Sequence, residues 1–278
     1  MPGVSCSAAR AGGRQLTPVA QLNGVPVSRA QITALALHNY GHYTSMRVDD
    51  MQVRGLSLHL QRLVQDCRRL FDVQLDPDWV RCLVRQALAE APRSVLVRMT
   101  MFDPDLPLER TGADARPQLL VTTRPAAATS FPALRLQSTQ YRRELPAVKH
   151  VGLFGSLRRR RIAQRNGFDD ALFTDAGTEV SEAATSNIGV ITGERIIWPQ
   201  APCLAGVTMR LINQAVGAQA GTSPITLGDL SGMDAVFATN AAIGIRPVST
   251  VDGTHFPTEH RMIDTLCKQY AAVPPDPV

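Results

Sequence analysis

The sequence predicts a mixed α/β protein of two domains. Its 278 residues, 44% of them hydrophobic, are enough for one large core or two medium ones. The first part carries both strand-like and helix-like patterns, and an aperiodic segment bounded by prolines follows it. A dense series of short strands and turns comes next, as in an antiparallel meander. We therefore expect a flexible arm at residues 1–17, a small domain at 18–123, a linker at 124–132 and a large domain at 133–278.

Four elements are expected in the first half of the small domain. Asn23-Gly24, between two apolar stretches, predicts a hairpin. Residues 41–48 read as a strand whose alternation places Tyr43 and Ser45 on one face and Thr44 on the other. Apolar residues at helical spacing predict a helix over 56–70. The capping sequence Asp76-Pro77-Asp78 predicts a second helix that runs to residue 90.

Two strands, at residues 94–102 and 118–123, complete the small domain. In the large domain we expect a strand at 133–138, then a helix at 156–166 that Gly167 ends. Four arginines in that helix, at 158–161, spread over all its sides and form no single base-reading edge. A strand and tight turn are expected at 168–177, followed by strands at 178–182, 186–192 and 194–198. A helix follows Gly206, a strand begins at Ala235, and the proline-rich tail at 272–278 is expected to fray.

Composition and charge narrow the classes of partner. Charged residues make up 19% and aromatic residues 5% of the chain, and the net charge is +5. Because no nucleic-acid module and no interleaving of aromatic with basic residues is seen, small anionic molecules are better candidates than nucleic acids. No run reaches about 18 apolar residues and the amino terminus has no signal-peptide core, so we expect no membrane span.

The cysteines indicate the compartment. They are odd in number, scattered, and contain no C-x-x-C pair: Cys6, Cys67, Cys82, Cys203 and Cys267. This pattern is typical of reduced thiols, so a cytoplasmic protein is expected. We predict no metal site.

The strongest functional signal is a lysine followed about thirty residues later by a carboxylate. Lys149 comes just after a proline-containing loop, Glu182 begins a run of small residues, and Asn187 opens an apolar segment. A reactive amine and a carboxylate on either side of a flat ring fit pyridoxal phosphate, held as a Schiff base with its ring nitrogen protonated. We expect Lys149 to be the amine and Glu182 the carboxylate.

Two turns are expected to bind the phosphate of this cofactor. The helix that starts at Gly206 presents the main-chain amides of Val207 and Thr208 together with a hydroxyl group. The strand from Ala235 runs into a turn of small residues, where backbone amides are expected to be unobstructed. That turn contains Asn240, Ala241 and Ala242.

Taken together, these segments resemble the class IV aminotransferases, the fold-type IV pyridoxal-phosphate enzymes, over residues 20–270. His59-x-x-Arg62-Leu is similar to the family's phosphate-binding helix, and Glu182-x-x-x-x-Asn187 to its segment at the pyridine nitrogen. Gly206-Val-Thr is similar to its phosphate turn. The resemblance implies a small α/β domain, a larger antiparallel pseudo-barrel with helices, a homodimer, and cofactor contacts from Arg62, Asn187 and Thr208.

The resemblance leaves the reaction open. Tyr43-Thr44-Ser45 and Asn240-Ala241 look like the aminodeoxychorismate lyases, which eliminate pyruvate. However, the residues after Lys149 lack the asparagine that many lyases carry. Phe154 also stands where branched-chain enzymes have a tyrosine beside the cofactor's ring hydroxyl. We therefore expect transamination between an amino acid or amine and a 2-oxo acid, with the lyase as the alternative and a catalytically silent cofactor-binding protein as the third possibility.

Proton abstraction is expected to be common to both reactions. Lys149, once freed, is expected to take the proton from the substrate's α-carbon while Glu182 keeps the ring protonated. Thr44 is expected to relay a proton to a leaving group, and Arg246 to bind a substrate carboxylate through a bidentate fork. Tyr43 and Ala242 are expected at the substrate.

Overall fold

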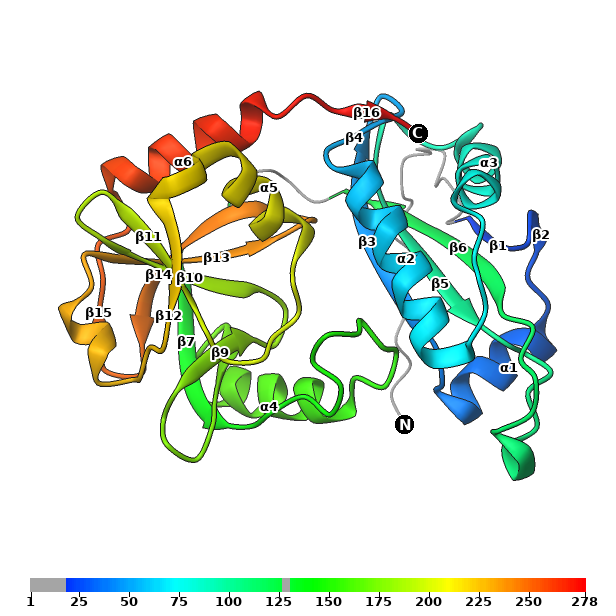
Figure 1. Cartoon of the computed structure of the whole chain (residues 1–278), viewed down its shortest axis with the longest axis horizontal. Helices are drawn as coiled ribbons and strands as arrows, with labels where there is room; N and C mark the ends of the chain where they lie inside the picture. The colour runs from blue at the N-terminus through cyan, green and yellow to red at the C-terminus, as the bar shows by residue number, and fades with distance from the viewer. Residues whose placement is uncertain (1–18, 127–130) are drawn as a thin grey trace, which may run out of the picture.

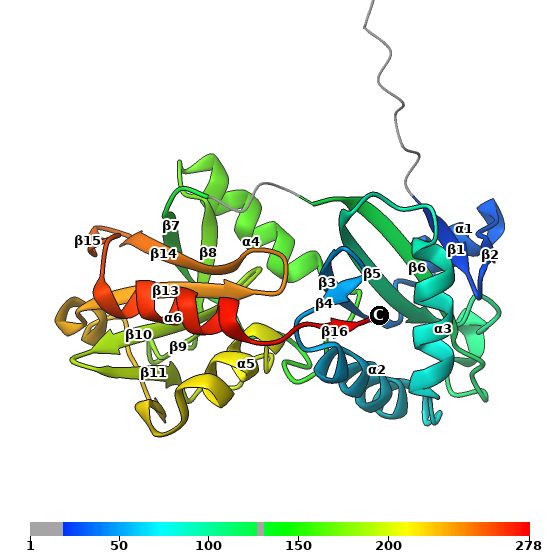
Figure 2. The ribbon, with the colours of Figure 1, turned by 90° about the horizontal axis from the view of Figure 1, so that it is seen from above.

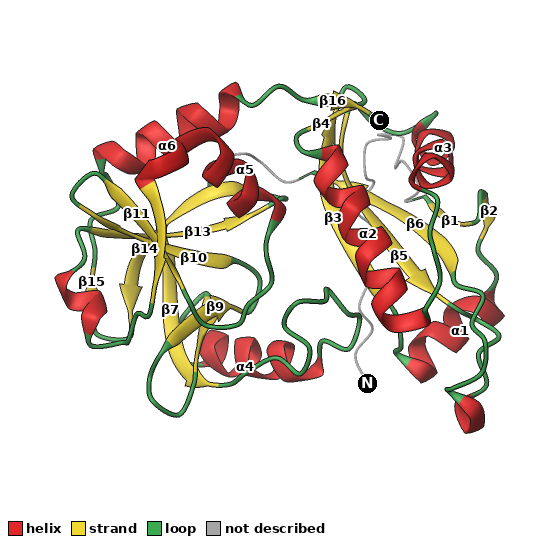
Figure 3. Ribbon diagram, in the orientation of Figure 1, coloured by secondary structure: helices red, strands yellow, loops and turns green. Residues whose placement is uncertain are grey.

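The computed structural model describes residues 19–126 and 131–278. The predicted arm at 1–17 and residues 127–130 of the predicted linker lie outside these described residues. Two sheets stand side by side, each with helices packed against it (Figure 1, Figure 3). The α-helices are α1 (Arg29–His38), α2 (Leu56–Phe71), α3 (Pro77–Leu88), α4 (Phe154–Arg165), α5 (Val207–Val216) and α6 (Arg261–Ala272).

The first sheet is antiparallel throughout, in the order β16-β4-β3-β5-β6-β1-β2. Helices α2 and α3 cover one face and share its main core, in which Met46, Leu63 and Val97 are fully buried. The strands are β1 (Ala20–Leu22), β2 (Val25–Pro26), β3 (His42–Asp49), β4 (Gln52–Val53), β5 (Ser94–Phe102), β6 (Gln118–Pro125) and β16 (Asp276–Pro277).

Local sequence explains the helices of this half. Asp76 caps α3 by accepting a hydrogen bond from the Asp78 amide, and Pro77 is its first residue, as predicted. Helix α1 is not among the predicted elements, although its signal is present. Ser28 and Gln31 form a capping box, in which each side chain accepts a hydrogen bond from the other residue's main-chain amide.

The second sheet closes on itself. Strands β10, β13, β14, β7, β8 and β9 pair in a ring, and the pairing of β9 with β10 closes it. The predicted barrel is confirmed, but its strands are not all antiparallel, because β7 pairs in parallel with both β8 and β14. The strands are β7 (Leu134–Gln140), β8 (Asp170–Thr174), β9 (Val180–Ala183), β10 (Asn187–Thr192), β11 (Arg195–Pro199), β12 (Ala220–Ser223), β13 (Ala235–Asn240), β14 (Gly244–Val251) and β15 (Thr254–His255).

Helices α5 and α6 pack together on one side of the barrel. Their apolar residues, among them Ile212 and Leu266, meet Trp198 and Phe237 in a buried cluster. Helix α4 packs on β8, where Ala163 contacts Phe173. Among the described residues, no helix combines the length and the apolar character needed to cross a membrane.

The tail is not frayed, so that prediction is wrong. It leaves α6, crosses to the first sheet and adds β16 to β4 at its edge (Figure 2). Val278 is buried, and the side chains of Arg81 and Arg85 donate hydrogen bonds to the last main-chain oxygens. The carboxylate of Asp276 accepts a hydrogen bond from the Leu56 amide at 3.2 Å, at the start of α2. Proline content alone suggested fraying, but these long-range bonds order the segment.

Candidate functional site

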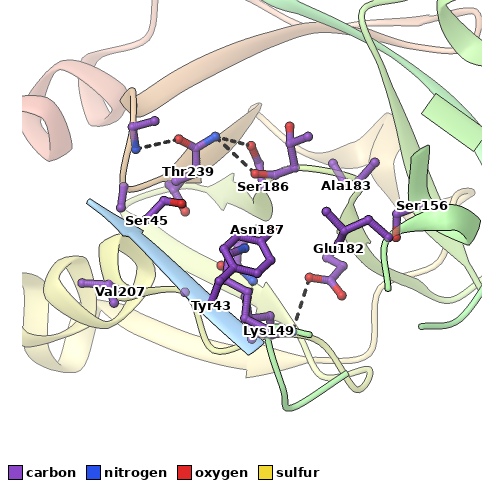
Figure 4. A pocket seen from close by; sticks show the side chains of 18 of the residues that line it. Tyr43, Ser45, Lys149, Ser156, Glu182, Ala183, Ser186, Asn187, Val207 and Thr239 are labelled. Carbon is purple, nitrogen blue, oxygen red and sulfur yellow. Dashed lines mark hydrogen bonds between the residues drawn. The ribbon is translucent and has the colours of Figure 1, made fainter. Parts of the chain in front are cut away.

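A cavity of about 270 Å³ lies between the two sheets. Strands β3 and β5 and helix α2 contribute side chains from the first sheet, and strands β9, β10 and β13 contribute from the barrel. Figure 4 shows the side chains of Tyr43, Lys149, Glu182 and Asn187 gathered around it. Most of the residues predicted from the sequence line this cavity: Tyr43, Arg62, Lys149, Glu182, Asn187, Val207, Asn240, Ala241 and Ala242.

Lys149 lies on a loop that is held by the first sheet. Its main-chain oxygen accepts a hydrogen bond from the Tyr43 amide at 2.8 Å, and its own amide donates to Asp66 at 3.1 Å. Its Nζ lies 5.0 Å from the centre of the Tyr43 ring. Burial and the nearby guanidinium groups of Arg62 and Arg143 lower the pKa of Lys149 to about 7. A large fraction of this amine is therefore neutral and nucleophilic near pH 7.

Glu182 faces the same cavity from the barrel. Its Oε1 lies 3.5 Å from Nη1 of Arg143, and its Oε2 accepts a hydrogen bond from the Leu204 amide at 3.3 Å. Burial raises the pKa of Glu182, and Arg143 and the Leu204 amide oppose that rise. Asn187 pairs with Glu182 across β9 and β10. The carboxylate is thus held by two donors in a dry environment.

One end of the cavity is built for an anion. Nη2 of Arg62 donates a hydrogen bond to the main-chain oxygen of Ala205, beside the start of α5. Burial lowers the pKa of Arg62 to about 10, so the group remains charged at neutral pH. A Cβ at Gly206 would collide with Oδ1 of Asn187, so a larger residue here would displace that side chain. Gly206 and Val207, at the start of α5, line the cavity near Arg62, and the start of a helix favours an anion.

The turn after β13 is partly occupied by its own asparagine. Oδ1 of Asn240 accepts hydrogen bonds from the amides of Ala242 and Ile243 at 3.0 and 3.1 Å. Its Nδ2 donates to Thr185 and Ser186. The expectation of unobstructed amides throughout this turn is therefore wrong for these two positions, because a local side chain satisfies them.

Three predicted residues lie outside the cavity lining. Thr44 is on the opposite face of β3 from Tyr43, where its hydroxyl lies 2.7 Å from Nδ1 of the buried His59. Thr208 is buried at the second position of α5. Arg246 lines a separate cavity, and its Nε donates a hydrogen bond to the main-chain oxygen of Pro132. The structure therefore gives no support to the predicted roles of Thr44 in proton relay and Arg246 in carboxylate binding.

The structure also brings in residues that the sequence analysis did not select. Arg98 stacks on Tyr43, with its guanidinium carbon 3.6 Å from the ring centre, and it pairs with Ser45 across β3 and β5. Arg124 on β6 and Arg143 also line the cavity. Only strand register places Arg98 beside Tyr43, so no local motif marks it. Phe154, in contrast, is 77% exposed at the start of α4 and lies outside the lining.

The lining is strongly cationic. Among the described residues, Glu182 is the one acidic residue of the lining, against five cationic side chains: Arg62, Arg98, Arg124, Arg143 and Lys149. Such a site favours a ligand with several negative charges. An aldehyde near Lys149, a phosphate near Arg62 and a ring nitrogen near Glu182 all match pyridoxal phosphate, so the residues fit this cofactor.

Comparison with known proteins agrees with this reading. Residues 41–251 match the model of the amino-transferase class IV family. A protein of Rickettsia felis described as a probable branched-chain-amino-acid aminotransferase is 24% identical over 276 residues, which cover 91% of this chain and 94% of that protein.

Two solved structures show the same fold. The branched-chain aminotransferase from Thermoproteus uzoniensis is 19% identical, with a TM-score of 0.79 and coverage of 91% of this chain and 93% of its own. The 4-amino-4-deoxychorismate lyase from Pseudomonas aeruginosa is 21% identical, with a TM-score of 0.75 and coverage of 90% and 97%. Fold and site together define a pyridoxal-phosphate-dependent enzyme. The chain belongs to the class IV aminotransferase family.

Proposed function

We propose that this protein transfers an amino group between an amino acid and a 2-oxo acid, with pyridoxal phosphate attached to Lys149. The observation that carries the proposal is the meeting of Lys149 and Glu182 in one cationic cavity, with Lys149 on a loop held by the first sheet and Glu182 on β9 of the barrel. Bound pyridoxal phosphate supplies an aldehyde that captures amines and a ring that accepts electrons from the substrate's α-carbon. The residues of the chain have to bind the cofactor, orient the substrate and transfer protons.

Each of these tasks has a residue in the site. Arg62 and the first amides of α5, from Val207 and Thr208, bind the phosphate. Glu182 keeps a proton on the ring nitrogen, and Asn187 holds the segment around Glu182 by donating to the main-chain oxygen of Leu204 at 2.6 Å. Lys149, neutral near pH 7, would take the proton from the substrate's α-carbon and hold it for return to the cofactor's aldehyde carbon.

The substrate carboxylate is assigned to Arg98 in place of Arg246. Arg98 lines the cavity beside Tyr43 and, among the described residues, forms no ion pair with a carboxylate. Arg124 lies two residues further along the neighbouring strand and adds a second positive charge at the same wall. A guanidinium without an acidic partner is a good carboxylate ligand because its paired N–H groups match the two oxygens.

The lyase alternative loses one of the observations that favoured it, the expected role of Thr44. Elimination needs a proton donor for the leaving group, and the expected donor, Thr44, faces α2 and contacts His59. Tyr43 and Ser45 are the hydroxyl-bearing residues of that strand that line the cavity. Transamination needs no such donor, because Lys149 would both remove the proton from the α-carbon and return it to the cofactor's aldehyde carbon.

The test is to incubate the purified protein and pyridoxal phosphate with L- and D-amino acids and with aminodeoxychorismate. Conversion of the cofactor to pyridoxamine phosphate, with release of a 2-oxo acid, is the expected result. Release of pyruvate from aminodeoxychorismate alone would show the lyase reaction. Cofactor binding without either product would indicate a silent cofactor-binding protein.

A homodimer in the cytoplasm is proposed as the working form. The α4 helix exposes large apolar side chains, among them Phe154 and Leu157, and Leu157 also lines the cavity. Exposed apolar groups beside a site are typical of a surface that another chain covers. None of the four described cysteines forms a disulfide, which supports a reducing compartment. Light scattering of the purified protein tests the dimer, and a monomer mass would exclude it.

A further inference from the structure

The loop that carries Lys149 is irregular, and the first sheet holds its main chain. Besides the bond from Tyr43 to the Lys149 oxygen, the amide of Val151 donates to the oxygen of Gly41 at 2.9 Å. His42 and His150 face each other in this short antiparallel bridge. Strand β3 thus fixes one side of the loop. The amide of Lys149 takes a partner from a different element, helix α2.

That partner is Asp66. Its Oδ2 accepts the Lys149 amide at 3.1 Å, and its side chain is only 2% exposed. The nearest cationic partner, Nη1 of Arg69, is 4.0 Å from Oδ1. Within the described part of the chain, the Lys149 amide is the one hydrogen-bond donor found at this carboxylate.

A carboxylate in this position has an electrostatic cost. Burial raises the pKa of Asp66, while the Lys149 amide and the charges of Arg62 and Arg69 oppose that rise. An ionised oxygen is a stronger acceptor for a main-chain amide than a neutral one, so the bond to Lys149 is strongest when Asp66 is charged. The desolvation of Asp66 is thus offset by the main-chain amide of the lysine loop together with these charges.

We propose that Asp66 is a positioning residue that fixes the lysine loop to helix α2. Arg62 and Asp66 are four residues apart and lie on the same face of the helix. One rigid element therefore holds the phosphate-binding guanidinium and the main chain of the reacting lysine at a set separation. This inference rests on the proposed role of Lys149, and it adds Asp66 to the residues on which that role depends.

The experiment measures how fast added pyridoxal phosphate becomes attached to Lys149. Samples are reduced with borohydride at set times and digested, and the modified lysine is quantified by mass spectrometry. D66A removes the acceptor, and D66N keeps a side-chain oxygen of the same shape. We expect D66A to slow attachment about tenfold, because one charge-assisted hydrogen bond is lost, and D66N to recover part of the rate, because its neutral oxygen is a weaker acceptor.

A matched control separates positioning from general stability. Asp103 is also buried in the first half of the chain and accepts the amides of Asp105 and Arg116, but it lies outside the cavity lining. D103A should lower the midpoint of thermal unfolding and leave the attachment rate close to that of the unsubstituted protein. If D66A attaches at the unsubstituted rate, or if D103A slows attachment as much as D66A, the inference is wrong.

A second measurement needs no variant to fold. Amide exchange followed by NMR should show the Lys149 amide protected in the unsubstituted protein, because it donates to a buried carboxylate. Fast exchange at this amide would also overturn the inference. Failure of the unsubstituted protein to be labelled at Lys149 would instead refute the proposed function, so the two failures are distinguishable.

Discussion

The chemistry at Lys149 depends on its protonation state. Only the neutral amine attacks an aldehyde, and the pKa of Lys149 is lowered from 10.5 to about 7 by burial and by Arg62 and Arg143. The rate of pyridoxal phosphate attachment to the cofactor-free protein should therefore rise with pH, reach half its maximum near pH 7 and be constant above about pH 8. Stopped-flow absorbance checks this. A rate that keeps rising to pH 10 would mean that the lysine is not perturbed.

The two candidate arginines give opposite expectations. R98A should raise the KM for a carboxylate-bearing amino acid about 10- to 100-fold, since it removes a charge-assisted bidentate contact. R246A should change KM by less than about twofold, because Arg246 lies outside the cavity. Steady-state kinetics with an amine that lacks a carboxylate is the control, and R98A should not raise that KM. Equal effects of the two variants would contradict the assignment.

Sequence motifs identified the site residues that local spacing in the chain marks. Lys149, Arg62 and Glu182 were predicted from their neighbours, and all line the cavity. Arg98 was not predicted because its position depends on the pairing of β3 with β5, which lies across about fifty residues of chain. The strand alternation placed Thr44 on the opposite face from Tyr43, as the structure has it, and this placement conflicts with the proton-relay role expected of Thr44.

At the scale of elements, the tail acts as a cap for α2. Gly55 precedes this helix without a side-chain cap, and Asp276 supplies one from the other end of the chain. D276A should lower the free energy of unfolding by about 1 kcal/mol and weaken pyridoxal phosphate binding a few-fold, because the first turns of α2 lead to Arg62. Urea denaturation and equilibrium titration measure these two quantities.

The cap of α3 provides a matched comparison. D76A removes the Asp76 side chain that accepts the Asp78 amide, and the expected loss of unfolding free energy is also about 1 kcal/mol. Helix α3 contributes no side chain to the cavity, so cofactor affinity should stay unchanged. If D76A and D276A weaken cofactor binding equally, the effect of the tail on α2 is not specific.

Most elements were predictable from local signals, and the exceptions have a physical reason. The caps of α3 and the alternation of β3 agree with the structure. The tail was expected to fray because its order comes from bonds to residues about two hundred positions away. Parallel pairing of β7 was not predicted because strand direction depends on the path of the chain between strands.

For the whole molecule, the site joins two bodies. The first sheet and α2 hold Lys149 and Arg62, and the barrel holds Glu182 and the start of α5. A boundary at 124–132 remains a prediction, which is supported by the end of β6 at Pro125 and the start of β7 at Leu134. A ligand that contacts both bodies should stabilise their association.

This arrangement predicts that the cofactor stabilises the fold. Pyridoxal phosphate at 100 times its Kd should raise the free energy of unfolding by about 2.7 kcal/mol and increase Tm. K149A should lose much of this increase, since only the phosphate and ring contacts remain. Differential scanning fluorimetry with and without cofactor measures it. An unchanged Tm at saturating cofactor would contradict a site that spans the two sheets.

The central claim is attachment of the cofactor at Lys149, and the composition of the chain makes it directly testable. The sequence contains two lysines, Lys149 in the cavity and Lys268 exposed on α6. Borohydride reduction of the protein with stoichiometric pyridoxal phosphate, followed by peptide mass spectrometry, should place the phosphopyridoxyl group on Lys149 and leave Lys268 unmodified. Modification of Lys268 alone, or of neither lysine, would contradict the account.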